Sequence, residues 1–192
     1  MTTIENLRFR GARVLRGDTL ETGDLSIVAG RLHDPADGHH ASCVDLPGYW
    51  ILPGIVDLHG DAFERHMAPR PTAPFANDIA LRSVDHDAAS NGVTTAWMAQ
   101  SWSWEGGSRG PDFAEQFMQD LDAYRPQALT DLRIQLRCET HTIATEQQLI
   151  AAIARHKIDD VIFNDHIGEA VDMISTDLES LSLWGRRAGR SL

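Results

Sequence analysis

The sequence is poor in cysteine, in basic residues and in long apolar runs, and each shortage excludes a class of protein. Two cysteines, Cys43 and Cys138, among 192 residues cannot build a disulfide framework and suggest no cysteine-based zinc site. Seventeen Lys and Arg against 28 Asp and Glu leave a net charge of −11, which disfavours binding to nucleic acid or to an anionic membrane surface. No window approaches the roughly 18 consecutive apolar residues of a membrane span.

The remaining composition is that of a folded protein. Hydrophobic residues make up 42% and charged residues 23%, which excludes wholesale disorder. Residues 1–10 are charged and contain no apolar run, so we expect no signal peptide. We therefore predict a cytoplasmic globular protein, and its nine histidines are the unusual feature.

The pattern of apolar residues changes near residue 54. Residues 1–54 contain short apolar runs separated by glycine-containing turns and show no helical period, which predicts a small β unit. Residues 55–192 alternate short strands with amphipathic helices, an order typical of parallel βαβ units and of the α/β class. The expected strands are 51–59 (as a buried strand), 93–98, 132–138 and 160–165, and the expected helices are 77–90, 111–125, one opened by a capping box at 145–148, and 169–184.

Histidine and carboxylate side chains fall at three of the expected strand ends. His59 and Asp61 follow the first strand, and because they are two residues apart they leave the same face of an extended segment. Glu139 ends the third strand and His166 follows the fourth. The carboxyl ends of parallel strands converge, so these side chains predict a divalent-metal site. Such nitrogen and oxygen donors suit Zn, Mn, Fe, Ni or Mg.

Each of these residues also has an ordinary explanation. A lone His-x-Asp is most often part of a surface loop, and Glu139 could pair with Arg133 or Arg137. His166 could be a core histidine or a helix cap. Their coincidence at three strand ends favours the metal site.

The segment 45–59, Asp-Leu-Pro-Gly-Tyr-Trp-Ile-Leu-Pro-Gly-Ile-Val-Asp-Leu-His, resembles the opening of the amidohydrolase superfamily. The resemblance implies a small N-terminal β-sandwich over residues 1–54, joined by a Pro-Gly turn to a TIM-type (β/α)8 barrel. Most members have His-x-His where this chain has His59-Gly60-Asp61. That departure, the Pro-Arg-Pro at 69–71 and the stretches 90–95, 136–139 and 164–166 resemble the phosphonate-metabolism branch, the alpha-D-ribose 1-methylphosphonate 5-triphosphate diphosphatases of the carbon–phosphorus lyase pathway.

This resemblance implies a binuclear metal centre. His59 and Asp61 would bind one ion, Glu139 would bridge where relatives use a carboxylated lysine, and His166 would bind the second. Zinc is the expected metal, with Mn, Fe or Ni as alternatives. By strand count Glu139 and His166 fall on the third and fourth strands, whereas the superfamily uses the fourth and fifth.

The implied substrate is a small phosphorylated sugar. Metal-bound hydroxide would attack its triphosphate and release diphosphate. Arg65, His66 and Arg70 are the expected anchors for phosphate oxygens, because arginine can bind them in bidentate fashion. An exposed ion pair with a nearby acid is the alternative for Arg70. The chain's Trp-rich stretch 97–104 does not match the diphosphatase pattern.

Length limits the resemblance. The 138 residues after residue 54 are fewer than the roughly 250 of a complete barrel. We therefore expect the first half of a barrel, with the general-base Asp beyond residue 192, and either a longer protein or a homo-oligomer. Open strand edges and an uncovered apolar interior would then favour association. The alternatives are an amidohydrolase that opens a cyclic amide or deaminates a small ring, and a non-catalytic metal-binding fragment.

Overall fold

The computed structural model describes residues 6–33, 42–70 and 73–187. The chain divides between Gly54 and Ile55 into two compact units. No helix in the described part of the chain is long and apolar enough to cross a membrane.

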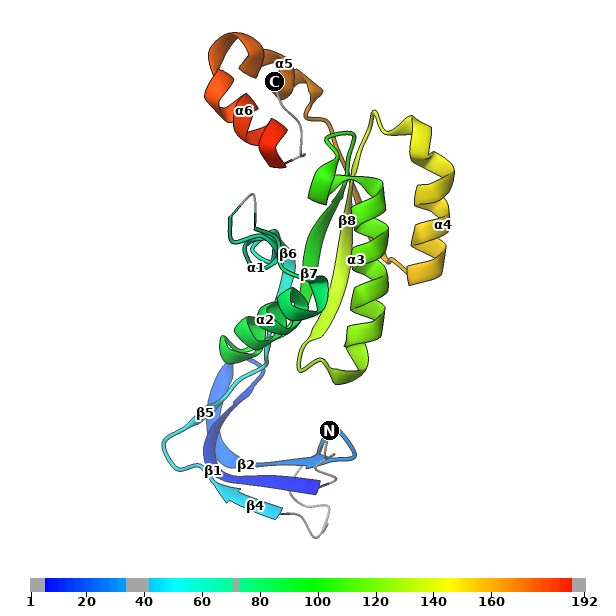
Figure 1. Ribbon diagram of the computed structural model, residues 1–192. Coiled ribbons are helices and arrows are strands. Elements are labelled where there is room, and N and C mark those ends of the chain that lie inside the picture. The colour runs from blue at the N-terminus through cyan, green and yellow to red at the C-terminus, as the bar shows by residue number, and fades with distance from the viewer. Residues whose placement is uncertain (1–5, 34–41, 71–72, 188–192) are drawn as a thin grey trace. The chain divides into compact units, whose positions relative to one another are not determined.

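The first unit is a single five-stranded sheet (Figure 1). Strands β1 (Asn6–Arg16) and β2 (Thr19–Val28) form an antiparallel hairpin, and β3 (Arg31–His33) extends it beside β2. The short strands β4 (Ser42–Asp45) and β5 (Trp50–Ile51) both run parallel to β1. The described residues of this unit supply one sheet, so the second layer of a β-sandwich stays a prediction.

The second unit is built on a four-stranded parallel sheet in the order β6-β7-β8-β9. Its strands are β6 (Ile55–Gly60), β7 (Val93–Trp102), β8 (Asp131–Glu139) and β9 (Asp160–Asn164). The helices α2 (Asn77–Ser90), α3 (Pro111–Tyr124) and α4 (Glu146–His156) connect successive strands (Figure 1). The predicted α/β architecture with part of a parallel barrel is confirmed.

Shorter elements complete this unit. The single-turn helix α1 (Glu64–Met67) follows β6, and 3₁₀ turns lie at Gly107–Arg109, Arg125–Gln127 and Ile143–Thr145. The chain then forms α5 (Ile167–Thr176) and α6 (Leu178–Arg187). The prediction of one helix over 169–184 was therefore wrong. The carboxylate of Asp177 accepts hydrogen bonds from the amide and the hydroxyl of Ser180, at 3.0 and 2.6 Å, and so starts a new helix there.

The predicted capping box at 145–148 is also absent. The hydroxyl of Thr145 donates to the carbonyl oxygen of Thr142 at 3.2 Å and accepts from the indole of Trp102 at 3.0 Å. The amide of Gln148 points to Glu115 on α3. Both side chains are thus used in tertiary contacts and not in the local cap that the sequence pattern predicted.

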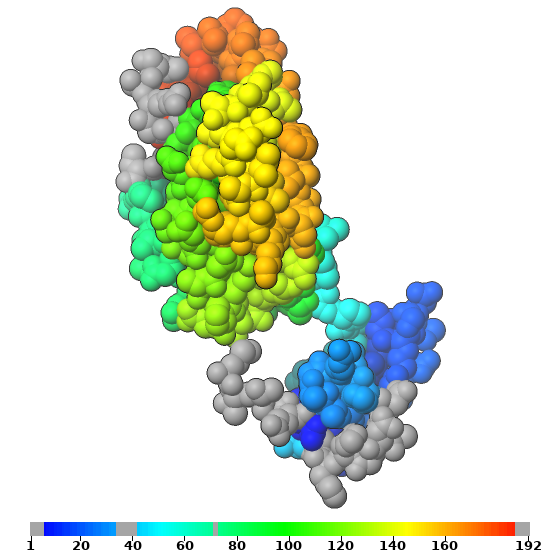
Figure 2. All heavy atoms as spheres, turned by 90° about the vertical axis from the view of Figure 1, so that its right-hand side faces the viewer, coloured from blue at the N-terminus to red at the C-terminus, as the bar shows by residue number. Residues whose placement is uncertain are grey.

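The hydrophobic core lies between the sheet and the connecting helices. Pro111 opens α3, as proline suits a first helical turn, and Phe117 and Leu121 lie fully buried on its inner stripe. Phe63, just before α1, stacks on Phe117 with ring centroids 5.4 Å apart. In Figure 2 the atoms of α4, in yellow, pack against the neighbouring elements of this unit. Ala152 of α4 is buried in the same hydrophobic core.

The sheet face opposite the helices is polar on β8. Leu132, Ile134 and Leu136 point into the core, while the alternating residues include Arg133 and Gln135. Arg133 stacks on Trp97, 4.7 Å from the ring centroid, and pairs with Asp131 at 2.7 Å. Polar side chains on this face of β8 thus find partners on the sheet, as Arg133 does in Asp131 and Gln135 does in Asp160.

Strand β6 also differs from its prediction as a buried strand. Val56 and Leu58 are 53% and 64% exposed. In the described sheet β6 is an edge strand, paired on one side with β7 alone, and that position explains its exposure.

A buried carboxylate joins three elements of this unit. Asp85 of α2 is fully buried and accepts hydrogen bonds from the hydroxyl of Tyr124, at 2.9 Å, and from the amides of Leu129 and Thr130, at 2.8 Å each. Burial and the bond to Asp85 raise the pKa of Tyr124 to about 12. The stabilisation from the neutral hydroxyl is therefore complete below about pH 10 and is lost as the pH rises through 12.

We expect Asp85→Ala to destabilise the second unit by about 3 kcal/mol or more, because three donors would lose their acceptor inside the protein. Tyr124→Phe removes only one of those donors and should cost about 1 kcal/mol. Chemical denaturation monitored by tryptophan fluorescence measures both. Equal effects of the two variants would contradict the assignment of Asp85 as the shared acceptor.

Candidate functional site at the carboxyl edge of the parallel sheet

A hydrogen-bonded bridge joins His59 to the middle of β8. His59 Nδ1 is hydrogen-bonded to Oε1 of Gln135, whose side chain is almost fully buried. The amide nitrogen of Gln135 donates to Asp160 Oδ2 at 2.6 Å and to the carbonyl oxygen of Leu58 at 3.3 Å. Strand β7 lies between β6 and β8, and its Ala99 pairs with Gln135. The bridge therefore connects three strands at a position where the intervening strand carries a small residue.

A second polar pair lies at the ends of β8 and β9. Glu139 is 4% exposed, and its Oε2 accepts a hydrogen bond from the amide of His166 at 3.1 Å. Its Oε1 lies 2.5 Å from His166 Nδ1. His166 precedes α5, and its ring lies nearly perpendicular to that of Trp184, with centroids 6.4 Å apart. The buried carboxylate is thus paired with His166 and starts a helix.

The strand count of the sequence holds in the structure. Glu139 ends β8, the third strand of the described sheet, and His166 follows β9, the fourth. Arg133, an alternative partner of Glu139, pairs with Asp131 and Asp159.

The structure does not bring the four predicted metal ligands together. Gln135, the partner of His59, precedes Glu139 by four residues on β8, a rise of about 13 Å along the strand. Within 6–33, 42–70 and 73–187, no group of three or more His, Cys, Asp or Glu side chains could share an ion. Imidazole and carboxylate suit a divalent metal in chemistry. A catalytic zinc site takes three protein ligands, so these pairs fit part of a metal site but not a complete one.

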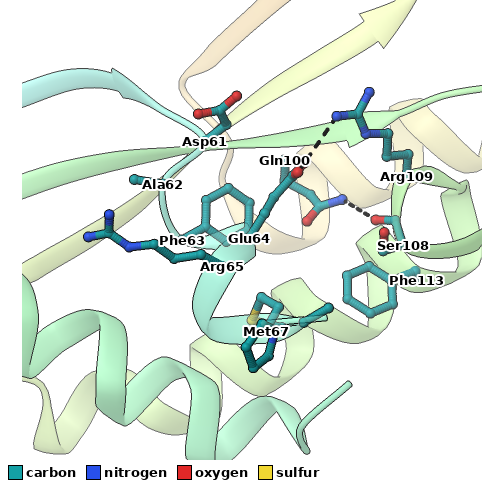
Figure 3. A pocket seen from close by; sticks show the side chains of 12 residues that line it. Asp61, Ala62, Phe63, Glu64, Arg65, Met67, Gln100, Ser108, Arg109 and Phe113 are labelled. Carbon is teal, nitrogen blue, oxygen red and sulfur yellow. Dashed lines mark hydrogen bonds and ion pairs between the residues drawn. The ribbon is translucent and has the colours of Figure 1, made fainter. Parts of the chain in front are cut away.

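A pocket of about 480 Å³ opens beside the end of β6 (Figure 3). Asp61 and Arg65 line it together with Gln100 and Arg109, over apolar side chains that include Phe113. The carboxylates of Glu64 and Glu105 lie 3.6 and 3.4 Å from the guanidinium of Arg109. Figure 3 shows the contact between Glu64 and Arg109 and the hydrogen bond from Gln100 to the carbonyl of Ser108.

Sequence reasoning missed the contribution of Gln100 and Arg109 to this pocket. The available signal was the run of polar residues that follows the apolar start of β7. Gln100, Ser101 and Ser103 are all buried, which is unusual for polar residues unless they are hydrogen-bonded or functional.

The predicted phosphate anchors differ in their surroundings. The guanidinium of Arg65 donates to Asp87 of α2 at 2.8 Å, and His66 Nε2 lies 3.2 Å from the same carboxylate. These two partners, Arg65 first, hold the pKa of Asp87 below its usual range. Arg70 is exposed and lies outside the lining of the pocket beside β6. The phosphate-binding role of all three residues stays a prediction.

Comparison with known proteins relates the chain to the hydrolases that its sequence resembles. No protein-family model matches it. It is 24% identical over 151 residues to the alpha-D-ribose 1-methylphosphonate 5-triphosphate diphosphatase of Escherichia coli (strain K12), in a match covering 76% of this chain and 40% of that protein. The predicted resemblance to the phosphonate-metabolism branch of the amidohydrolase superfamily is thereby confirmed.

Two solved structures share the fold. A D-hydantoinase matches 94% of this chain and 38% of its own with a TM-score of 0.55 at 15% identity. The formyltransferase/hydrolase complex from Methylorubrum extorquens matches 87% of this chain and 34% of its own, also with a TM-score of 0.55, at 18% identity. The chain thus spans 40% or less of the length of each relative.

We expect Glu139→Gln to loosen the start of α5. The variant keeps one acceptor oxygen for the two nitrogens of His166, so one hydrogen bond to a charged group is lost, worth about 1.5–3 kcal/mol. Hydrogen exchange of the His166 amide should accelerate by about tenfold or more. Glu146→Gln, at an exposed position in the first turn of α4, is the matched control. Exchange that is the same in both variants would contradict the pairing.

Proposed function

We propose that this chain forms part of a hydrolase of the amidohydrolase type that releases diphosphate from alpha-D-ribose 1-methylphosphonate 5-triphosphate. The observation that carries the proposal is the similarity to the Escherichia coli diphosphatase. It is supported by the placement of His59, Asp61 and Glu139 at the carboxyl ends of parallel strands, where the α/β folds gather their chemistry.

The proposal includes two divalent ions, zinc first, with manganese, iron or nickel as alternatives. The resemblance gave Glu139 a bridging role between the ions. Because Glu139 pairs with His166 and His59 with Gln135, we instead assign His59 and Asp61 to one ion and Glu139 with His166 to the other, with further donors needed at each. When bound, such ions lower the pKa of water and neutralise charge on a phosphoryl group. Glu139 is buried, so its carboxylate lies outside bulk water. In these less polar surroundings the carboxylate attracts a cation more strongly than it would in water.

Cationic side chains would bind the phosphate oxygens. The net charge of −11 repels an anion, so a triphosphate needs local compensation. Arg65 and Arg109 line the pocket beside Asp61, and His66 lies next to Arg65. We include Arg70, an exposed residue that follows Arg65 and His66 in the chain, as a third group that would bind phosphate oxygens.

Substrate assays separate this function from its alternatives. We expect the full-length protein, supplied with zinc or manganese, to release diphosphate from the ribose triphosphate and to leave a hydantoin unchanged, with both products quantified by chromatography. Opening of the cyclic amide without diphosphate release would show that the branch is wrong. Bound metal without turnover of either substrate would support the non-catalytic alternative.

Metal content tests the ligand assignment directly. We expect His59→Ala to reduce the affinity for zinc by about tenfold or more, the usual effect of losing a group that holds the metal. Equilibrium dialysis with elemental analysis measures it. His86→Ala, at an exposed position on α2, is the matched control. Unchanged zinc binding in His59→Ala would remove this residue from the proposed site.

A further inference from the structure

The two hydrogen bonds donated by Gln135 fix the orientation of its side-chain amide. The carboxylate of Asp160 and the carbonyl oxygen of Leu58 are both acceptors and contain no hydrogen to donate. The nitrogen of the Gln135 amide must therefore face them, and its oxygen must face His59.

The same reasoning reaches the imidazole of His59. The Gln135 oxygen is an acceptor only, so the His59 Nδ1 bonded to it must carry a proton. In the neutral ring the other nitrogen, Nε2, then carries a lone pair. We propose that Gln135 is a positioning residue that holds His59 in the Nδ1–H tautomer, with Nε2 ready to bind a metal ion or accept a proton. The use of Nε2 rests on the proposed function, whereas the tautomer does not.

The surrounding sheet supports this role for Gln135. Gln135 is 7% exposed, so its end of the hydrogen bond to His59 is shielded from competing water, whereas His59 itself is exposed. The charge of Asp160, 2.6 Å from the amide nitrogen, polarises the amide and makes its oxygen a stronger acceptor. The side chain of Ala99 is small enough for residues of β6 and β8 to meet across β7.

Histidines that bind metals generally donate their other ring N–H to a carbonyl, a carboxylate or water, which fixes the tautomer. Gln135 supplies such an oxygen here. Free imidazole side chains prefer the opposite tautomer, with the proton on Nε2. The hydrogen bond to Gln135 should therefore shift the tautomer ratio of His59 measurably.

Nitrogen-15 NMR of the histidine rings tests this inference in protein without metal or substrate. The spectra are recorded at about pH 8.5, two units above the ordinary histidine pKa of about 6.5. We expect His59, assigned by the loss of its signals in His59→Ala, to show a protonated Nδ1 and an unprotonated Nε2. In Gln135→Leu the ratio of Nδ1–H to Nε2–H should fall by at least about fivefold, as for the loss of one hydrogen bond.

The controls keep the outcome decisive. Gln116→Leu removes a glutamine that bonds Asp120 on the exposed side of α3 and should leave His59 unchanged. A wild-type His59 with its proton on Nε2, or a ratio unaffected by Gln135→Leu, would overturn the inference. The wild-type measurement stands even where Gln135→Leu does not fold. If His59 has the Nδ1–H tautomer but the protein has no diphosphatase activity, only the proposed function is overturned. If the protein has the activity but His59 carries its proton on Nε2, only the role of Gln135 is overturned.

Discussion

The second unit depends on one buried carboxylate. Asp85 accepts three hydrogen bonds, from the hydroxyl of Tyr124 at the end of α3 and from the amides of Leu129 and Thr130 before β8. A carboxylate removed from water is costly unless its oxygens accept hydrogen bonds. The position of Asp85 therefore constrains the end of α3 and the start of β8, which supply its donors. The register of β8 then decides which of its side chains face the core and which face the site.

That register separates an apolar from a polar face on β8. Gln135 and Glu139 are both buried on the polar face, one holding His59 and the other holding His166. Because they are four residues apart, the strand carries two distinct polar pairs instead of one cluster. A divalent ion bound at either pair needs ligands in addition to the residues of that pair. A match to the sequence motif alone therefore does not define a complete metal centre.

Local patterns predicted most of the second unit. The helices at 77–90 and 111–125 were predicted because their apolar spacing and flanking Gly or Pro agree with the packing that the protein adopts, and the second helix ends one residue earlier, at Tyr124. His59, Glu139 and His166 were predicted only as strand-end residues, and Gln135 was not predicted as a site residue, since its contact with His59 spans 76 positions. The break at Asp177 and the tertiary use of Thr145 were missed because tertiary or capping partners competed with the periodic pattern.

The cationic side chains near the site already have carboxylate partners. Arg65 is paired with Asp87, and Arg109 lies between Glu64 and Glu105. A phosphate ligand would therefore exchange one anion for another instead of meeting a free cation. Exposed ion pairs contribute only about 0–1 kcal/mol, so releasing Arg65 from Asp87 costs little. Arg109 is less exposed, and its partner Glu105 is buried, so its guanidinium keeps a fixed position from which it can share its remaining donors. Anion recognition at this edge would then combine one adaptable and one rigid arginine.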